Sequence, residues 1–168
     1  LIHISTDCVF DGNTTTSFVE DDEDFGESIY SVSKSIGELC ESCIIRTSII
    51  GEELYNHRNL LEFYKSKKNQ TISGYDNKIW NGITCLQLAK ILYQIINENL
   101  LWKGIRHVFS KESISKYELS ILINNIYNLN MNIQKESFGK NENRTLNTNY
   151  RENDYFDIPD LKTQVEEQ

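Results

Sequence analysis

Apolar residues recur along the chain in short runs and at helical spacing, separated by polar, turn-rich stretches. Cys43 to Ile50 is an apolar, β-branched run that ends at Gly51 and predicts a buried parallel strand. A period of about 3.6 residues predicts four helices. They cover residues 29–40, 60–67, 86–97 and 115–127.

Polar and capping residues set the limits of these elements. Ser28 is suited to cap the first helix, and Ser115 with Glu118 three residues later resembles a capping box for the last. Apolar and polar residues alternate over residues 105–110, which predicts a strand. Residues 11–27 are polar and rich in turn formers, which predicts a long exposed loop whose charges face solvent. Two further stretches are polar without a clear period, residues 70–82 and 133–168.

Strands and helices alternate along the chain, which predicts an α/β fold with a largely parallel sheet. Residues 1–4 form only the end of a strand and lack an initiator Met, so we expect the strand to begin upstream. No G-x-x-G-x-x-G turn occurs, although such a turn normally holds the pyrophosphate of a dinucleotide. Either the cofactor-binding half precedes this sequence or the protein uses no dinucleotide.

Composition narrows the function classes. A chain of 168 residues is long enough for one domain, which we expect to be a partial one, and its net charge of -8 argues against a nucleic-acid or anionic-membrane partner. No apolar stretch reaches the 18 to 20 residues, roughly, of a bilayer span, and no signal segment occurs, so we expect a cytoplasmic protein. The four cysteines, including the pair Cys40 and Cys43, are interpreted as free thiols, and no metal site is expected.

Candidate chemistry begins with Tyr30 and Lys34, which lie four residues apart and therefore share one helix face. A tyrosine hydroxyl has an ordinary pKa near 10, and a neighbouring ammonium stabilises its ionised form. Such a pair suits proton transfer, but the bare spacing also describes ordinary surface neighbours.

Three blocks occur in order: "STDCVFDG" from Ser5, "YSVSKSIGE" from Tyr30 and "IIRTSIIG" from Ile44. Together they resemble the extended short-chain dehydrogenase/reductase family, and within it the dTDP-4-dehydrorhamnose reductase-like sugar-nucleotide reductases. The resemblance continues through "WNGITCLQLAKIL", "SKYELSILI" and "NRTL". It implies the C-terminal portion of a Rossmann-like, doubly wound parallel sheet with a small substrate-binding region, taking part in nucleotide-sugar and polysaccharide biosynthesis.

The resemblance also implies roles by motif position. Thr6 would hydrogen-bond the substrate carbonyl, Tyr30 would act as general acid, and Lys34 would tune Tyr30 and hold the nicotinamide ribose. The cofactor would be NADPH or NADH, and the substrate a nucleotide-linked 4-keto-6-deoxysugar. The expected cofactor contacts are Ser5, Tyr30, Lys34, Thr47 and Ser48, and the expected substrate contacts are Thr6, Asn81, Thr84 and Arg144.

Departures from the family pattern leave alternatives open. Ile49 stands where rhamnose-forming reductases tend to have an aromatic residue, so the identity of the sugar is left open. A related epimerase or dehydratase remains an alternative, although Asp7 has no adjacent Glu to complete an acid/base pair. Two further alternatives are a non-catalytic nucleotide-binding or regulatory subunit and an inactive fragment. The sequence also leaves homodimer formation open. Arg46 is expected to brace loops more readily than to bind a phosphate.

Overall fold

The structure is a computed structural model that describes residues 1–23, 25–38, 41–151 and 155–168. Its central feature is a parallel sheet in the order β1–β2–β7, made of β1 (Ile2–Thr6), β2 (Cys43–Thr47) and β7 (Gly104–His107). Thr6 lies opposite Thr47 in the register, so the carboxyl ends of β1 and β2 are level. In open parallel sheets this is the end at which ligands bind.

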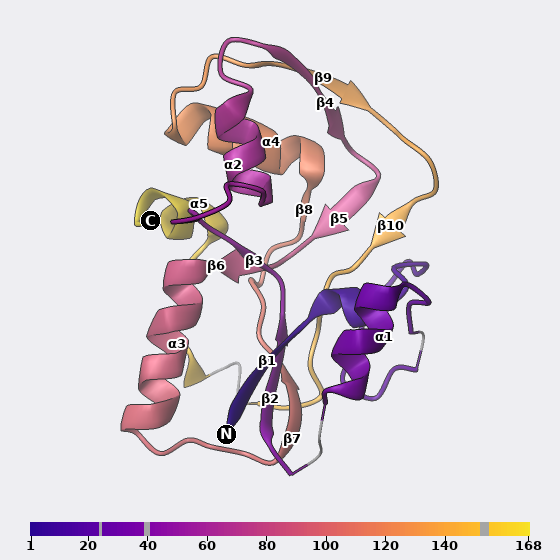
Figure 1. Ribbon diagram of the computed structural model, residues 1–168, viewed down its shortest axis with the longest axis vertical. Coiled ribbons are helices and arrows are strands. Elements are labelled where there is room, and N and C mark those ends of the chain that lie inside the picture. The colour runs from indigo at the N-terminus through magenta and orange to yellow at the C-terminus, as the bar shows by residue number, and fades with distance from the viewer. Residues whose placement is uncertain (24, 39–40, 152–154) are drawn as a thin grey trace.

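Helices flank the sheet on two sides (Figure 1). On one side α3 (Cys85–Asn97) packs Leu88, Ile91 and Ile95 into a cluster with Ile45 of β2. On the other side α1 (Ile29–Ile36) lies next to β1 and the short 3-10 turn η1 (Asp7–Val9) that follows it. The mixed α/β fold with parallel strands predicted from the sequence is confirmed.

A second group of elements, the upper lobe, lies above the sheet in Figure 1. It contains α2 (Leu60–Ser66), β4 (Thr71–Tyr75), α4 (Lys116–Ile126), β9 (Asn132–Glu136) and α5 (Leu161–Glu166). Its apolar cluster includes Leu61, Leu119 and Ile123, each almost fully buried. Because β4 pairs in parallel with β9, the lobe joins segments that are about sixty residues apart in sequence.

Short strands connect the upper lobe to the central sheet. β5 (Lys78–Trp80) pairs in parallel with β10 (Glu142–Asn143) and antiparallel with β8 (Ile114–Ser115). β3 (Ile49–Ile50) pairs in parallel with β6 (Ile83–Thr84). The lining of the candidate site comes largely from these connections.

Gln164 of α5 ties the end of the chain to this junction. Its side chain accepts from the backbone N–H of Thr84 at 3.1 Å and donates to Ser110 Oγ at 3.0 Å and to the carbonyl of Pro159 at 2.8 Å. The side chain is almost fully buried, so its polar atoms exchange water for these partners.

Several predicted elements differ in detail. The strand predicted over 43–50 is interrupted at Ser48, and the first helix ends at Ile36, while Leu39 and Cys40 lie outside the described residues. The last helix has the predicted capping box, with both Ser115 and Glu118 bonds present. Cys8, Cys43 and Cys85 are free thiols as predicted. No helix in the described ranges is long and apolar enough to cross a membrane.

The prediction of a long exposed loop over residues 11–27 was wrong in part, because Phe18 and Glu20 are buried. The polar stretches 70–82 and 133–168 contain β4, β5, β9, β10 and α5, none of which the apolar pattern indicated. Strands of two to five residues with polar neighbours give too few apolar positions to show a period.

Candidate active site

Thr6 is the last residue of β1 and caps η1. Its Oγ1 accepts the N–H of Cys8 at 3.1 Å and lies 3.1 Å from Asp7 Oδ1, to which its hydroxyl donates. Asp7 is buried, and burial raises the pKa of its carboxyl, although hydrogen bonds from Thr6, Cys8 and Ser48 oppose this. The hydroxyl of Thr6 is therefore held in a fixed direction at the end of the sheet.

Tyr30 and Lys34 lie one turn apart on α1, which Ser28 starts by accepting the N–H of Ser31 at 3.0 Å. The Nζ of Lys34 donates to the carbonyl of Ile4 at 2.9 Å, so this side chain spans from α1 to the middle of β1. Tyr30 is 55% exposed, which leaves its ring open to a ligand. The structure thus places Lys34 close to the strand that carries Thr6.

A buried ion pair fixes the orientation of α1. Glu38, just beyond the helix, accepts from Arg46 Nε at 2.9 Å and from Arg46 Nη2 at 2.7 Å, and it accepts the hydroxyl of Ser5 at 2.6 Å. The guanidinium also lies 5.0 Å from the ring centroid of Phe10. Arg46 braces the segment after α1 against β2, and the hydroxyl of Ser5 gives its proton to the same carboxylate.

The remaining residues expected at the site separate into two groups. Thr47 is buried at the end of β2, and Ser48, half-buried, faces the same cavity as Asp7. Asn81 uses both ends of its amide on Leu146, and Thr84 caps α3 by accepting the N–H of Gln87. Asn81 and Thr84 therefore serve structural bonds, and neither lines one of the cavities described below.

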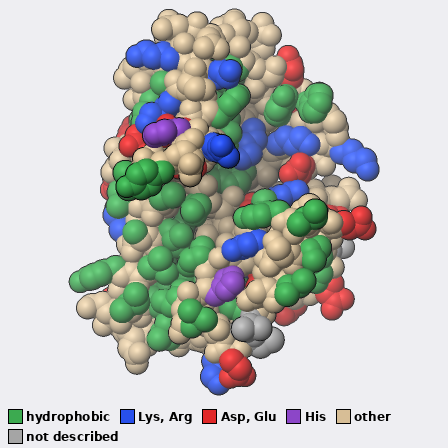
Figure 2. All heavy atoms as spheres, viewed as in Figure 1, with side chains coloured by type: hydrophobic (Ala, Val, Ile, Leu, Met, Phe, Trp, Pro, Cys, Tyr) green, Lys and Arg blue, Asp and Glu red, His purple; other side chains and the backbone are tan. Residues whose placement is uncertain are grey.

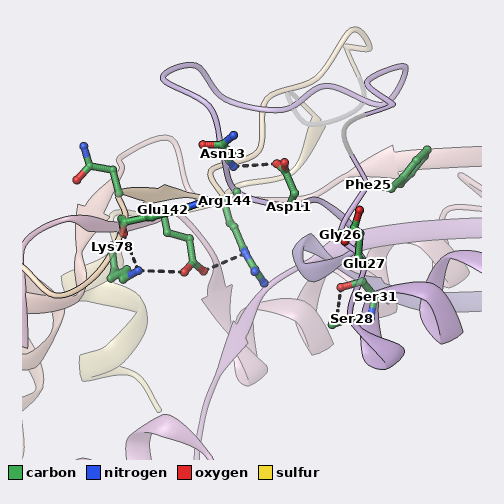
Figure 3. Close-up of a pocket in the computed structure, with 13 residues that line it drawn as sticks. Asp11, Asn13, Phe25, Gly26, Glu27, Ser28, Ser31, Lys78, Glu142 and Arg144 are labelled. Carbon is green, nitrogen blue, oxygen red and sulfur yellow. Dashed lines mark hydrogen bonds and ion pairs between the residues drawn. The ribbon is translucent and has the colours of Figure 1, made fainter.

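Three adjoining cavities, which have lining residues in common, lie near Asp7 and Ser48. The α1 cavity, about 430 Å³, is lined by loop residues 11–13 and 25–27 and by Ser28 and Ser31 (Figure 3). The middle cavity, about 130 Å³, is lined by Asp7, Cys8 and Ser48. The α2 cavity, about 580 Å³, is lined by Leu60, Phe63, Tyr64, Ile72 and Tyr75. Lys78 and Glu142 line all three cavities, which we call together the cleft.

Charged side chains converge on the centre of the cleft. Lys78 and Arg144 flank Glu142, with Lys78 Nζ 3.3 Å from Oε2 and Arg144 Nε 3.0 Å from Oε1. Lys116 lines the middle and α2 cavities with its Nζ 5.3 Å from the Trp80 ring centroid. Burial lowers the pKa of Lys116, and nearby Asp7 opposes that shift. Blue side chains accordingly gather between the upper lobe and α1 in Figure 2.

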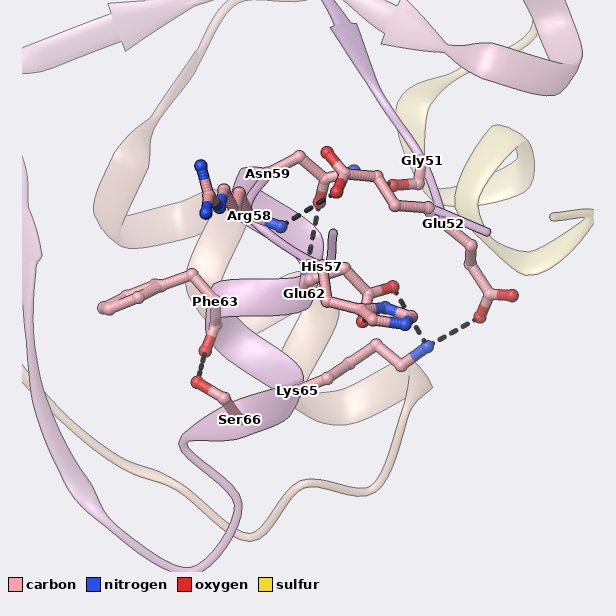
Figure 4. A network of polar contacts seen from close by, with 10 residues as sticks. Gly51, Glu52, His57, Arg58, Asn59, Glu62, Phe63, Lys65 and Ser66 are labelled. Atoms are coloured by element: carbon pink, nitrogen blue, oxygen red, sulfur yellow. Dashed lines mark hydrogen bonds and ion pairs between the residues drawn. The ribbon is translucent and has the colours of Figure 1, made fainter. Parts of the chain in front are cut away.

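A polar network ties α2 to the segment at Gly51 and Glu52 (Figure 4). Asn59 caps the helix and its Nδ2 donates to the carbonyl of Gly51 at 2.6 Å. Lys65 lies 2.9 Å from Glu52 and 3.5 Å from Glu62, which also pairs with His57 at 3.2 Å. The network fixes the start of α2, whose Leu60 and Phe63 line the α2 cavity.

Thr6, Tyr30, Lys34 and Arg144 were expected at the site from the sequence, whereas Lys78, Lys116 and Glu142 of the cleft were not. Lys116 is the first residue of an amphipathic helix, and the other two lie in short strands, so no motif marked them. Tyr30 and Lys34 line none of the three cavities, although Ser31 between them does. In the described part of the chain no three His, Cys, Asp or Glu side chains group as metal ligands would.

Comparisons with known proteins agree with this fold. Residues 1–150 match the family described as the RmlD substrate binding domain, whereas curated proteins give no match. A dTDP-4-dehydrorhamnose reductase from Bacillus anthracis str. Ames, in complex with NADP, has a TM-score of 0.81 at 23% identity over 99% of this chain and 63% of that chain. The corresponding enzyme from Clostridium acetobutylicum ATCC 824 gives 0.78 at 19% identity, over 99% and 63%.

A dTDP-glucose 4,6-dehydratase from Bacillus anthracis str. Ames, in complex with NAD, has a TM-score of 0.72 at 14% identity, over 99% of this chain and 59% of that chain. The chain therefore spans less than two thirds of the length of these three proteins. At such identities the likeness shows a common fold, and it includes both reductases and a dehydratase.

Proposed function

The chain belongs to the RmlD substrate binding domain family, and from this premise we propose that it serves the reduction of a nucleotide-linked 4-keto-6-deoxysugar by NADPH or NADH. The observation that carries the proposal is the cleft itself. At one end it approaches α1 and the residues after Thr6, its centre is cationic, and at its other end it is apolar and aromatic. This order matches a keto-sugar, a diphosphate and a nucleobase in line.

The reacting end is assigned to Thr6, Tyr30 and Lys34. When a ketone is reduced, negative charge develops on its oxygen, and a fixed donor there lowers the barrier. The hydroxyl of Thr6 is such a donor once the ketone oxygen replaces Asp7 as its acceptor. Tyr30 then gives its proton to the same oxygen, and the ammonium of Lys34 favours the phenolate left behind.

The nicotinamide would supply the hydride, and this chain offers part of its binding site. Lys34 uses one N–H on Ile4, which leaves donors for a ribose hydroxyl, and Thr47 and Ser48 lie at the level of Thr6 across the sheet end. These three residues would contact a nicotinamide and its ribose that lie against the end of the sheet. No glycine-rich turn for the pyrophosphate occurs in the 168 residues.

The diphosphate is assigned to the centre of the cleft. Lys78, Lys116 and Arg144 line this part of the cleft, and the Nε of Arg144 lies 3.0 Å from Glu142 Oε1. Three cationic side chains that converge in a partly buried position favour an anionic ligand. Phe63, Tyr64 and Tyr75 of the α2 cavity supply aromatic surface for a base.

Two alternatives remain. A dehydratase or epimerase would use the same tyrosine and lysine, and one similar structure is a dehydratase. Reduction is favoured because Cys8, and not Glu, follows Asp7, so an acid/base carboxylate pair beside Thr6 is lacking. A nucleotide-binding subunit without turnover would keep the cationic centre but would not need the exposed Tyr30 hydroxyl.

The test is to mix the protein with NADPH and a nucleoside diphospho-4-keto-6-deoxysugar, following NADPH absorbance and the sugar product. Consumption of NADPH in step with a 4-hydroxy sugar supports reduction. Binding of the nucleotide sugar without turnover, in this chain and in any longer product of the same gene, supports the subunit alternative. Absence of binding by both would overturn the proposal.

A further inference from the structure

Glu142 occupies the centre of the cleft, where the proposed diphosphate would lie. Its backbone is fixed in β10, with its N–H donating to the carbonyl of Asn77 at 2.9 Å. Its side chain is 38% exposed and its two oxygens are shared between Lys78 and Arg144. One carboxylate therefore pairs with both cations when no ligand is bound.

The surroundings of Glu142 favour this placement. Gly12 has φ +77, and a Cβ at that position would come within 2.8 Å of Glu142 Cγ and 3.1 Å of Arg144 Cγ. The loop at Gly12 also accepts the N–H of Asn143 at 2.9 Å. The absence of a side chain at residue 12 thus leaves the space in which Glu142 and Arg144 meet.

We propose that Glu142 is a specificity-determining residue that competes with anionic ligands for Lys78 and Arg144, excluding free phosphate while admitting a nucleoside diphosphate. This inference rests on the proposed function, since it assumes that the cleft takes a nucleotide sugar. A tethered group acts at an effective concentration on the order of millimolar or more. Free phosphate must displace the carboxylate with its charge alone.

A nucleoside diphosphate has a further source of binding energy, because its base enters the α2 cavity between Phe63 and Tyr75 while its phosphates reach the cations. Apolar burial of the base offsets the cost of moving Glu142 aside. Glu142 is only partly buried, so it can turn toward solvent without breaking its backbone bonds to β5. The carboxylate thereby selects ligands that fill both parts of the cleft.

The test compares wild type, E142Q and the matched control E112Q, because Glu112 is exposed and lines none of the three cavities. Calorimetry with dTDP, thymidine and inorganic phosphate measures each affinity. E142Q is expected to bind dTDP about tenfold more tightly and to bind phosphate measurably, while thymidine affinity stays unchanged. E112Q is expected to match wild type for all three ligands.

E142D provides a second variant if E142Q does not fold, since a shorter carboxylate reaches both cations poorly and should also tighten dTDP binding. Wild type that binds dTDP while E142Q and E142D bind it no more tightly would overturn the role of Glu142 and leave the proposed function standing. Failure of wild type and both folded variants to bind dTDP or UDP would overturn both proposals. Tighter thymidine binding by E142Q would also contradict the competition.

Discussion

Arg46 and Glu38 form a two-point ion pair, with Nη2–Oε2 2.7 Å and Nε–Oε1 2.9 Å, and their side chains are only 3% and 4% exposed. The pair links β2 to the segment that follows α1. Because Ser5 of β1 donates to the same carboxylate, one buried group holds both strands and the helix that carries Tyr30 and Lys34.

Breaking this pair should destabilise the protein. Replacing Arg46 by Met leaves the Glu38 carboxylate buried without its cation, and removal of one partner of a buried pair costs about 3–5 kcal/mol. Urea denaturation followed by circular dichroism measures the free energy of unfolding. The control is R58M, because the side chain of Arg58 is exposed. It should change the free energy of unfolding by about 0.5 kcal/mol or less. Equal effects of both substitutions would contradict the bracing role.

Replacing Tyr30 by Phe should lower turnover without weakening substrate binding. The substitution removes only the proton that the ketone oxygen receives, and loss of a general acid costs roughly 10²–10⁴ in kcat. The assay is NADPH oxidation at saturating keto-sugar nucleotide, with KM from the same data. Y155F, which changes another exposed tyrosine, is the control. Full activity of Y30F would remove Tyr30 from the mechanism.

Alanine at position 82 should disturb the centre of the cleft. A Cβ there would overlap the carbonyl oxygen of Ser48 and the Trp80 ring. Relief of such contacts requires backbone movement, at a cost of about 1–3 kcal/mol. G37A is a matched control, because its Cβ would meet the end of the His3 side chain at 3.2 Å and the carbonyl oxygen of Lys34 at an ordinary contact distance of 3.4 Å. The melting temperatures of the two variants are compared, and G82A is expected to melt at the lower temperature. Equal melting temperatures would contradict a steric clash at position 82.

Acid should weaken the contact between the buried loop residue Glu20 and β7. Burial raises the pKa of Glu20, but His107 and hydrogen bonds from Thr148 and Asn149 outweigh it, and the net pKa is lowered. Burial lowers the pKa of His107, although Glu20 opposes this, and Arg46 lowers it further. The unfolded chain therefore takes up protons before the folded one as pH falls.

Both shifts have the same sign for stability. The contribution of His107 is present above its ordinary value of 6.5 and declines below it, and that of Glu20 declines below 4.5. We expect the melting temperature of wild type to fall from pH 7 to pH 4. In H107Q the fall in melting temperature between pH 7 and pH 5 should be smaller than in wild type. H57Q, which changes an exposed histidine, should show the same fall as wild type. An unchanged slope in H107Q would contradict the assignment.

The sequence indicated the sheet and the candidate residues Tyr30 and Lys34 because their signals are local. The apolar run at Cys43 and the motif spacing of Tyr30 and Lys34 can be read without knowing what lies opposite. The cationic centre could not be predicted, because Lys78 and Glu142 come together only when β5 pairs with β10. Glu20 was misread as a solvated charge for the same reason, since its partners Thr148 and Asn149 lie far along the chain.

The bonds of Gln164 have a consequence for synthesis on the ribosome. Its three partners lie in segments that emerge earlier, so the N–H of Thr84 and the hydroxyl of Ser110 must wait for α5 before they acquire this partner. The joint between the upper lobe and the central sheet therefore gains these bonds only after α5 has been synthesised and has docked.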